Sequence, residues 1–122
     1  MGRVPAAAEL IIIGGLPSAF RVSVTETGYL IVREPAVVRL SGDFDINARD
    51  ELRGALLEAV EAGPAEVVVD FGAAVFLDSE AMGALIEGLN AGQEAGVRLR
   101  IVNAHGIVHR VLEVSGVLAL FD

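Results

Sequence analysis

The chain has 122 residues, a length that suits one domain with a hydrophobic core of its own. Apolar residues make up 53% and charged residues 21%, which excludes a disordered or collagen-like chain. Its 17 acidic residues exceed the 9 basic ones and give a net charge of −8, so neither nucleic acid nor an anionic membrane is expected as a partner.

Residues 1–20 are predicted to form an N-terminal extension ahead of a single domain at residues 21–122. The longest stretch without a charge, residues 10–20, is too short to span a bilayer. A short strand is predicted at residues 10–13. Glu9 and Gly14 interrupt the pattern of a signal peptide, and the chain has no cysteine, so a cytoplasmic location is expected.

Apolar and polar residues alternate in the next part of the chain, which is typical of β-strands. The strands predicted here span residues 21–25, 29–33 and 36–40, with a turn at Thr27 and Gly28. The period then changes, and a helix is predicted at residues 48–61, with Asp45 or Asn47 as its cap.

Strands and helices alternate in the second half. The predicted elements are a buried strand at residues 66–71, a helix from Ser79 to Gly96, a strand at 97–102, a helix at 107–114 and a last strand at 117–121. This order predicts an α/β fold with a mixed sheet flanked by helices.

Two predicted loops at the carboxyl ends of strands, residues 41–45 and 76–80, are candidates for a functional site. Ser79 lies where its hydroxyl can cap the second helix. A phosphate there would meet free amides but would lie beside Asp78 and Glu80. Two charges 5–6 Å apart repel by roughly 3 kcal/mol, about a hundredfold in a binding equilibrium. Ser79 is therefore interpreted either as a helix cap or as a charge switch.

The polar residues of these loops also allow other interpretations. Asp43, Asp45 and Asp78 suit either a metal or acid–base cluster or ordinary turns. His105 and His109 lie four residues apart without a ligand pattern around them, so surface histidines are expected rather than a zinc site. The chain lacks a phosphate-binding loop and a nucleophile elbow, so it is not expected to be an enzyme or to hold a cofactor or metal.

Three segments together resemble the anti-sigma factor antagonists of the STAS family. They are the Leu-Ser-Gly-Asp-Phe-Asp loop at residues 40–45, the strand and loop at residues 67–79, and the helix end at residues 111–117. The likeness runs from about Arg21 to Asp122. It implies a STAS-like mixed sheet flanked by helices in a bacterial, cytoplasmic regulator of transcription.

The resemblance also implies a partner-switching function. Such a protein binds a serine-kinase anti-sigma factor and frees the sigma factor, and the kinase then phosphorylates the serine that corresponds to Ser79. A phosphatase reverses this step, and ATP and magnesium belong to the kinase. The partner surface implied for this chain comprises Asp43, Asp45, Asp78, Ser79, Glu80 and Met82.

The chain departs from the family pattern after Ser79. The family reads Asp-Ser-Ser/Thr-Gly-Leu/Met-Gly, whereas residues 78–83 here read Asp-Ser-Glu-Ala-Met-Gly. Glu80 adds a fixed negative charge, which either weakens the hold of the kinase or imitates the phosphorylated state. Two alternatives follow: a STAS scaffold that assembles without phosphorylation, as a homodimer through the extension for example, and a small-molecule sensor.

Overall fold

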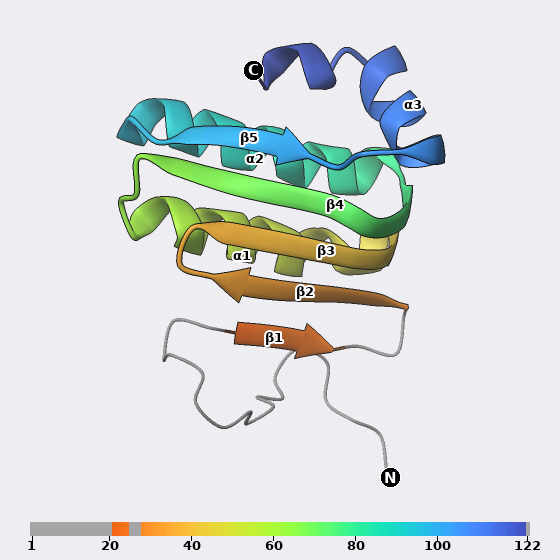
Figure 1. The fold of residues 1–122 in the computed structure, drawn as a ribbon, viewed down its shortest axis with the longest axis horizontal. Coiled ribbons are helices and arrows are strands. Elements are labelled where there is room, and N and C mark those ends of the chain that lie inside the picture. The colour runs from red at the N-terminus through yellow and green to blue at the C-terminus, as the bar shows by residue number, and fades with distance from the viewer. Residues whose placement is uncertain (1–20, 25–27, 122) are drawn as a thin grey trace, which may run out of the picture.

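A five-stranded mixed sheet forms the centre of the computed structural model, which describes residues 21–24 and 28–121 (Figure 1). Its strands are β1 (Arg21–Val24), β2 (Tyr29–Glu34), β3 (Val37–Phe44), β4 (Glu66–Leu77) and β5 (Arg98–Val102). The α-helices are α1 (Arg49–Glu61), α2 (Ser79–Ala95) and α3 (Gly106–Val114), and short 3-10 helices are η1 (Ile46–Ala48) and η2 (Leu118–Leu120).

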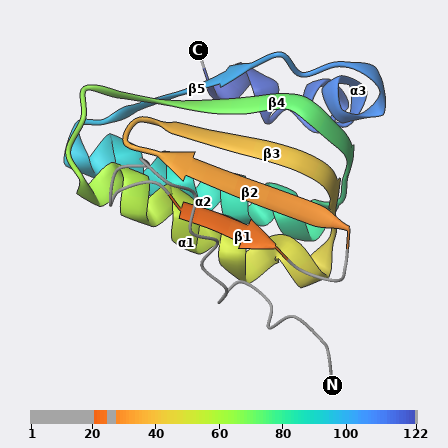
Figure 2. The ribbon, with the colours of Figure 1, turned by 60° about the horizontal axis from the view of Figure 1, so that its bottom comes forward.

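The strand order in the sheet follows the sequence. The pairs β1–β2 and β2–β3 are antiparallel, whereas β3–β4 and β4–β5 are parallel. The two parallel pairs are connected through α1 and α2, and connections of one hand place both helices on the same face of the sheet. Figure 2 shows α1 and α2 together beneath the sheet. The predicted mixed α/β fold is confirmed.

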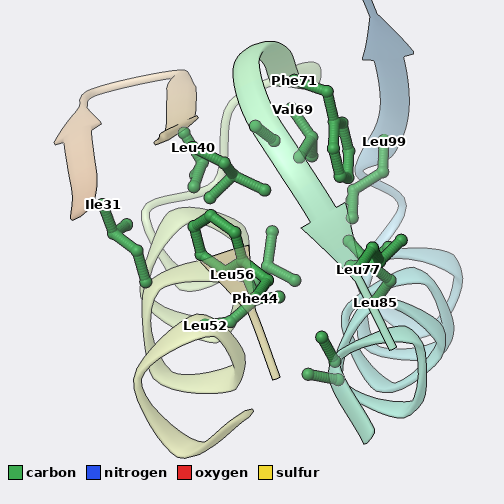
Figure 3. Close-up of a cluster of buried hydrophobic side chains, with 14 of the residues drawn as sticks. Ile31, Leu40, Phe44, Leu52, Leu56, Val69, Phe71, Leu77, Leu85 and Leu99 are labelled. Carbon is green, nitrogen blue, oxygen red and sulfur yellow. The ribbon is translucent and has the colours of Figure 1, made fainter. Parts of the chain in front are cut away.

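The core lies between the sheet and these two helices (Figure 3). Alternate residues of β3 and β4 point toward the helices, and residues four apart on each helix point back. The fully buried side chains include Phe44 and Phe71 from the sheet, Leu52 and Leu56 from α1, and Leu85 from α2. The helices predicted at residues 48–61 and from Ser79 to Gly96 are therefore confirmed, and each buries one face against the sheet.

Strand β4 extends beyond the predicted strand at residues 66–71 and ends at Leu77. It carries one extra residue opposite β3 at each of two register shifts, and such bulges bend and twist a strand. Beyond Phe71 the buried residues follow every third position, at Ala74 and Leu77. The loss of strict alternation explains why the sequence pattern underestimated the strand.

The predicted last strand at residues 117–121 is wrong. Gly116 adopts a positive φ of 84° and turns the chain, and one turn of 3-10 helix follows at Leu118–Leu120. This turn allows Val117 and Phe121 to be buried, while Ala119 between them is exposed. A strand would have placed all three residues on one face. Because only Val117 and Phe121 are buried, the 3-10 turn is favoured over a strand.

Helix α3 lies beside the part of β4 that extends past the end of β5 (Figure 1). The N-terminal extension and the strand predicted at residues 10–13 lie outside the described residues, so the domain boundary remains a prediction. Within the described part of the chain, every helix is too short or too polar to cross a membrane.

Candidate functional site

The two segments singled out in the sequence lie at adjacent strand ends. Phe44 pairs with Leu77 at the ends of the parallel strands β3 and β4. The backbone amide of Asp78 donates to the carbonyl oxygen of Phe44 at 3.0 Å. The residues after both strands therefore share one edge of the sheet, where η1 and α2 begin (Figure 1). This pairing brings Asp45 and Asp78, which follow the two strands, to the same end of the sheet.

The predicted loop at residues 41–45 is mostly strand, because β3 continues to Phe44. Gly42 has a φ of +91°, and a Cβ atom there would lie 1.9 Å from the carbonyl oxygen of Gly28. A side chain at this position would therefore push β3 away from the residue that precedes β2, at the end of the strand pair opposite the β2–β3 turn. Asp43 follows and is exposed on the opposite face of the sheet from buried Phe44, and thus away from α1 and α2.

Asp78 caps helix α2, so the predicted capping role of Ser79 is wrong. The Asp78 carboxylate accepts hydrogen bonds from the backbone amides of Glu80 and Ala81, both at 3.0 Å. Ser79 is the first residue of the helix and is exposed. The cap forms one residue earlier than predicted because Asp78, with extended backbone angles, places its carboxylate over the free amides.

Asp45 has the matching role at η1. Its carboxylate accepts a hydrogen bond from the amide of Asn47 at 2.9 Å, and α1 then begins at Arg49. The Tyr29 hydroxyl on β2 donates to the Asn47 carbonyl at 3.3 Å and to the Glu51 carboxylate. These bonds attach the start of α1 to the sheet. Asp45 and Asp78 are thus held as caps at the same edge.

Glu80 forms an ion pair with α1. Its Oε1 atom lies 2.9 Å from Nη1 of Arg49, and Arg53 pairs with Glu87 further along the two helices. The hydrogen bond to Glu80 is the main cause that raises the pKa of Arg49, and the charge of Asp50 adds to it. The negative charge that sets this chain apart from the family pattern is therefore compensated by a neighbouring helix.

Three large apolar side chains are exposed in the segments that lead to these caps. Ile46 is 60% exposed, Val75 is 56% exposed and Phe76 is 42% exposed. None of the three was among the predicted partner residues, because apolar side chains are usually core; in β4 the bulges change which residues face outward, and Ile46 is the first residue of η1. Met82, which it did select, packs partly against the core.

A second polar group lies where β4 and β5 diverge. Asn103 donates to the Asp70 carboxylate at 3.0 Å, and this hydrogen bond is the main cause that lowers the pKa of Asp70. The amide of Gly72 also donates to Asp70, while its carbonyl oxygen lies 2.9 Å from Nε2 of His105. These contacts join the β5–α3 connection to β4.

The described residues contain no group of three or more His, Asp or Glu side chains that could hold a metal ion. The metal interpretation of Asp43, Asp45 and Asp78 is therefore not supported. His105 is exposed and His109 is half-buried. This end of the sheet carries the exposed Ser79, the capping acids Asp45 and Asp78, and Glu80 paired with Arg49.

Comparison with known proteins gives a family and several relatives. A family model described as "Mlab, STAS domain" matches residues 28–121. The chain is 27% identical over 85 residues to an anti-sigma F factor antagonist from Paenibacillus polymyxa, which covers 69% of this chain and 73% of that protein.

Solved structures show the same fold. An anti-sigma factor antagonist from Mycobacterium paratuberculosis aligns with a TM-score of 0.60 and 25% identity, over 76% of this chain and 80% of that one. The anti-sigma factor antagonist SpoIIAA in its unphosphorylated form aligns with a TM-score of 0.62 and 20% identity, over 85% and 86% of the two chains. The resemblance stated from the sequence is confirmed.

Proposed function

Because the chain belongs to the STAS domain family, we propose that it is an anti-sigma factor antagonist whose switch is Ser79. In this proposal it binds a serine-kinase anti-sigma factor and thereby frees the sigma factor. Phosphorylation of Ser79 by the kinase ends the complex, and a phosphatase restores it.

The observation that carries the proposal is the division of roles between Asp78 and Ser79. Asp78 satisfies the amides of Glu80 and Ala81, so the Ser79 hydroxyl is exposed and is not needed as the helix cap. A kinase can therefore reach this hydroxyl without unwinding α2. A serine that served as the cap would lose its hydrogen bond on modification and destabilise the helix.

The chemistry requires nothing of this chain except the hydroxyl. The Ser79 oxygen attacks the γ-phosphorus of ATP bound by the kinase, the bond to the bridging oxygen of ADP breaks, and the hydroxyl proton is released. The product carries nearly two additional negative charges at neutral pH. These charges lie beside Asp78, and a partner surface that fits the neutral hydroxyl would have to strip water from them without pairing them, which weakens the complex.

The partner surface of this proposal combines charge with apolar contacts. Asp43, Asp45, Asp78, Glu80 and Met82 remain its candidate residues, together with the exposed apolar side chains of Ile46, Val75 and Phe76. Buried aromatic residues commonly contribute most to the affinity of an interface, and charged residues at its rim contribute specificity. Phe76 is therefore the expected anchor.

The test is intact-mass measurement after incubation with Mg-ATP and the serine-kinase anti-sigma factors encoded in the same genome. We expect one of them to add about 80 Da, the mass of one phosphate, and to add nothing to the Ser79→Ala variant. The affinity of that kinase should fall roughly a hundredfold after phosphorylation. Because Ser79 is not a cap, Ser79→Ala should unfold at the same temperature as the natural protein.

Two outcomes would overturn the proposal. A stable complex without any mass gain would mean that the chain binds as a scaffold and that Glu80 has separated binding from phosphorylation. If the chain forms no complex and gains no mass with kinases that are active on another antagonist, the proposed switch is excluded.

A further inference from the structure

Arg49 is the basic side chain that pairs with the residue next to the proposed phosphoacceptor. Its Nη1 atom is 2.9 Å from Oε1 of Glu80, and its Nε atom is 3.6 Å from Oδ1 of Asp50. The exposed fractions of the Arg49 and Glu80 side chains are 47% and 43%, so water surrounds the pair and the partners can exchange. The pair is a contact that can be broken without disturbing the core.

The acids around Ser79 differ in how firmly they are held. Asp78 accepts two backbone hydrogen bonds as the cap of α2. Glu80 is the next residue in the first helical turn, and its carboxylate accepts a hydrogen bond from the guanidinium of Arg49. A new anion on Ser79 would therefore compete with Glu80 for Arg49, while the Asp78 cap stays in place.

A phosphate is the stronger competitor for a guanidinium. It carries nearly two charges and three acceptor oxygens, and it accepts paired hydrogen bonds from arginine. We propose that Arg49 holds Glu80 in the unphosphorylated protein and transfers to the phosphate when Ser79 is phosphorylated, which leaves Glu80 uncompensated. The proposal rests on Ser79 being the phosphoacceptor and deepens that proposed function.

This exchange explains how Glu80 is compatible with a phosphorylation switch. While Arg49 compensates Glu80, the acidic edge does not imitate the phosphorylated state. After phosphorylation the guanidinium is drawn to Ser79, and the Glu80 carboxylate is left as a second charge that the complex would have to desolvate without its cation. Arg49 is thus a positioning residue that couples the phosphate to a second charge.

The structure provides a matched control in the next ion pair. Arg53 on α1 pairs with Glu87 on α2, and their side chains have exposed fractions of 49% and 51%. Arg53→Gln therefore removes the same charge and the same kind of contact as Arg49→Gln. It does so one helical turn farther along α1, about 5.4 Å, so its effect on the phosphate is expected to be weaker than that of Arg49.

The experiment installs phosphoserine at position 79 during translation, so no kinase is needed. The second pKa of the phosphate is followed by phosphorus NMR in the phosphorylated natural protein and in its Arg49→Gln and Arg53→Gln variants. The charged groups that face the pair, Asp50, Asp78, Glu80 and Glu87, are the same in all three. We expect Arg49→Gln to raise this pKa by about half a unit or more, because the dianion loses its cation, and Arg53→Gln to raise it clearly less.

A second readout follows the arginine itself. The side-chain Nε–Hε signal of Arg49 should move between the unphosphorylated and phosphorylated proteins, whereas that of Arg53 should not. An unchanged phosphate pKa in Arg49→Gln, or an equal rise in Arg53→Gln, would overturn the exchange.

Failure of the exchange and failure of the proposed function are distinguishable. If no anti-sigma kinase modifies Ser79, the proposed function fails whatever the NMR result. If a kinase modifies Ser79 but the phosphate pKa does not depend on Arg49, only the exchange fails.

Discussion

At the scale of single residues, the site depends on which of two neighbours caps α2. Asp78 and Ser79 are both good N-cap residues, and the sequence alone favoured the serine. In the structure Asp78 takes the cap, and its carboxylate is also favoured by the positive end of the helix dipole. This assignment releases the serine hydroxyl for modification and keeps one acid fixed beside it.

The cap can be tested by replacing Asp78. Asp78→Ala should lower the free energy of unfolding by about 1 kcal/mol, because the amides of Glu80 and Ala81 lose their acceptor. Asp78→Asn keeps an acceptor of similar capping strength and should retain most of the stability. Urea denaturation of the three proteins measures both effects. Equal losses in the two variants would mean that charge rather than the cap is responsible.

At the scale of elements, close packing of α1 against α2 sets the geometry of the edge that holds the site. A Cβ atom at Gly88 on α2 would lie 2.9 Å from Cδ1 and 3.0 Å from Cβ of Leu56 on α1. The same two helices are joined by the Arg49–Glu80 and Arg53–Glu87 pairs. The missing side chain at Gly88 therefore allows the helices to approach closely enough for both pairs to form.

Two glycines of the same helix should respond in opposite ways to alanine. Gly83→Ala places its Cβ where no atom lies within 4 Å, so it should raise the free energy of unfolding by up to about 1 kcal/mol through helix propensity. Gly88→Ala should lower the free energy of unfolding by about 1 kcal/mol. The cost of overpacking against Leu56 is larger than the gain in helix propensity that alanine brings. Thermal or urea unfolding distinguishes them, and a stabilised Gly88→Ala would show that the helices separate without cost.

At the scale of the whole molecule, a net charge of −8 acts on any partner before contact is made. The proposed partner surface contains both acidic side chains and exposed apolar side chains. Long-range attraction raises the association rate, whereas the desolvated apolar contacts mainly determine the dissociation rate. The two contributions can therefore be separated by kinetics.

We expect the association rate with the anti-sigma factor to fall about tenfold between roughly 20 and 300 mM salt, because ions screen the attraction. The dissociation rate should change little with salt. Phe76→Ala should instead raise the dissociation rate tenfold or more and leave the salt dependence of association as it was. Surface plasmon resonance measures both rates. An association rate that does not depend on salt would contradict the electrostatic part of this prediction.

Much of the fold could be predicted because its signals are local. The helices at Arg49–Glu61, Ser79–Ala95 and Gly106–Val114 follow the spacing of apolar residues, and Gly96 ends α2 with a φ of 76° as predicted. The motif at residues 40–45 requires its glycine because a Cβ atom at Gly42 would collide with the backbone of Gly28, just before β2. The fold class follows from the alternation of strands and helices.

Sequence reasoning was less successful for the C-terminal turn, the length of β4 and the exposed Phe76. Each depends on what lies next to the segment in space: the burial of Val117 and Phe121, and the register of β4 against β3. A bulge adds one residue without a distinctive local composition, so the periodicity of the sequence does not reveal it.

The sequence by itself determined the α/β class, the family and the position of Ser79 after Asp78, because these depend on residue types within a few positions of one another. Only the tertiary structure decided that Asp78 rather than Ser79 caps α2, that Phe76 faces outward, and that Arg49 compensates Glu80. Arg49 and Glu80 are 31 residues apart in the chain. Their contact exists because two helices pack side by side on one face of a sheet, a relation that local spacing does not encode.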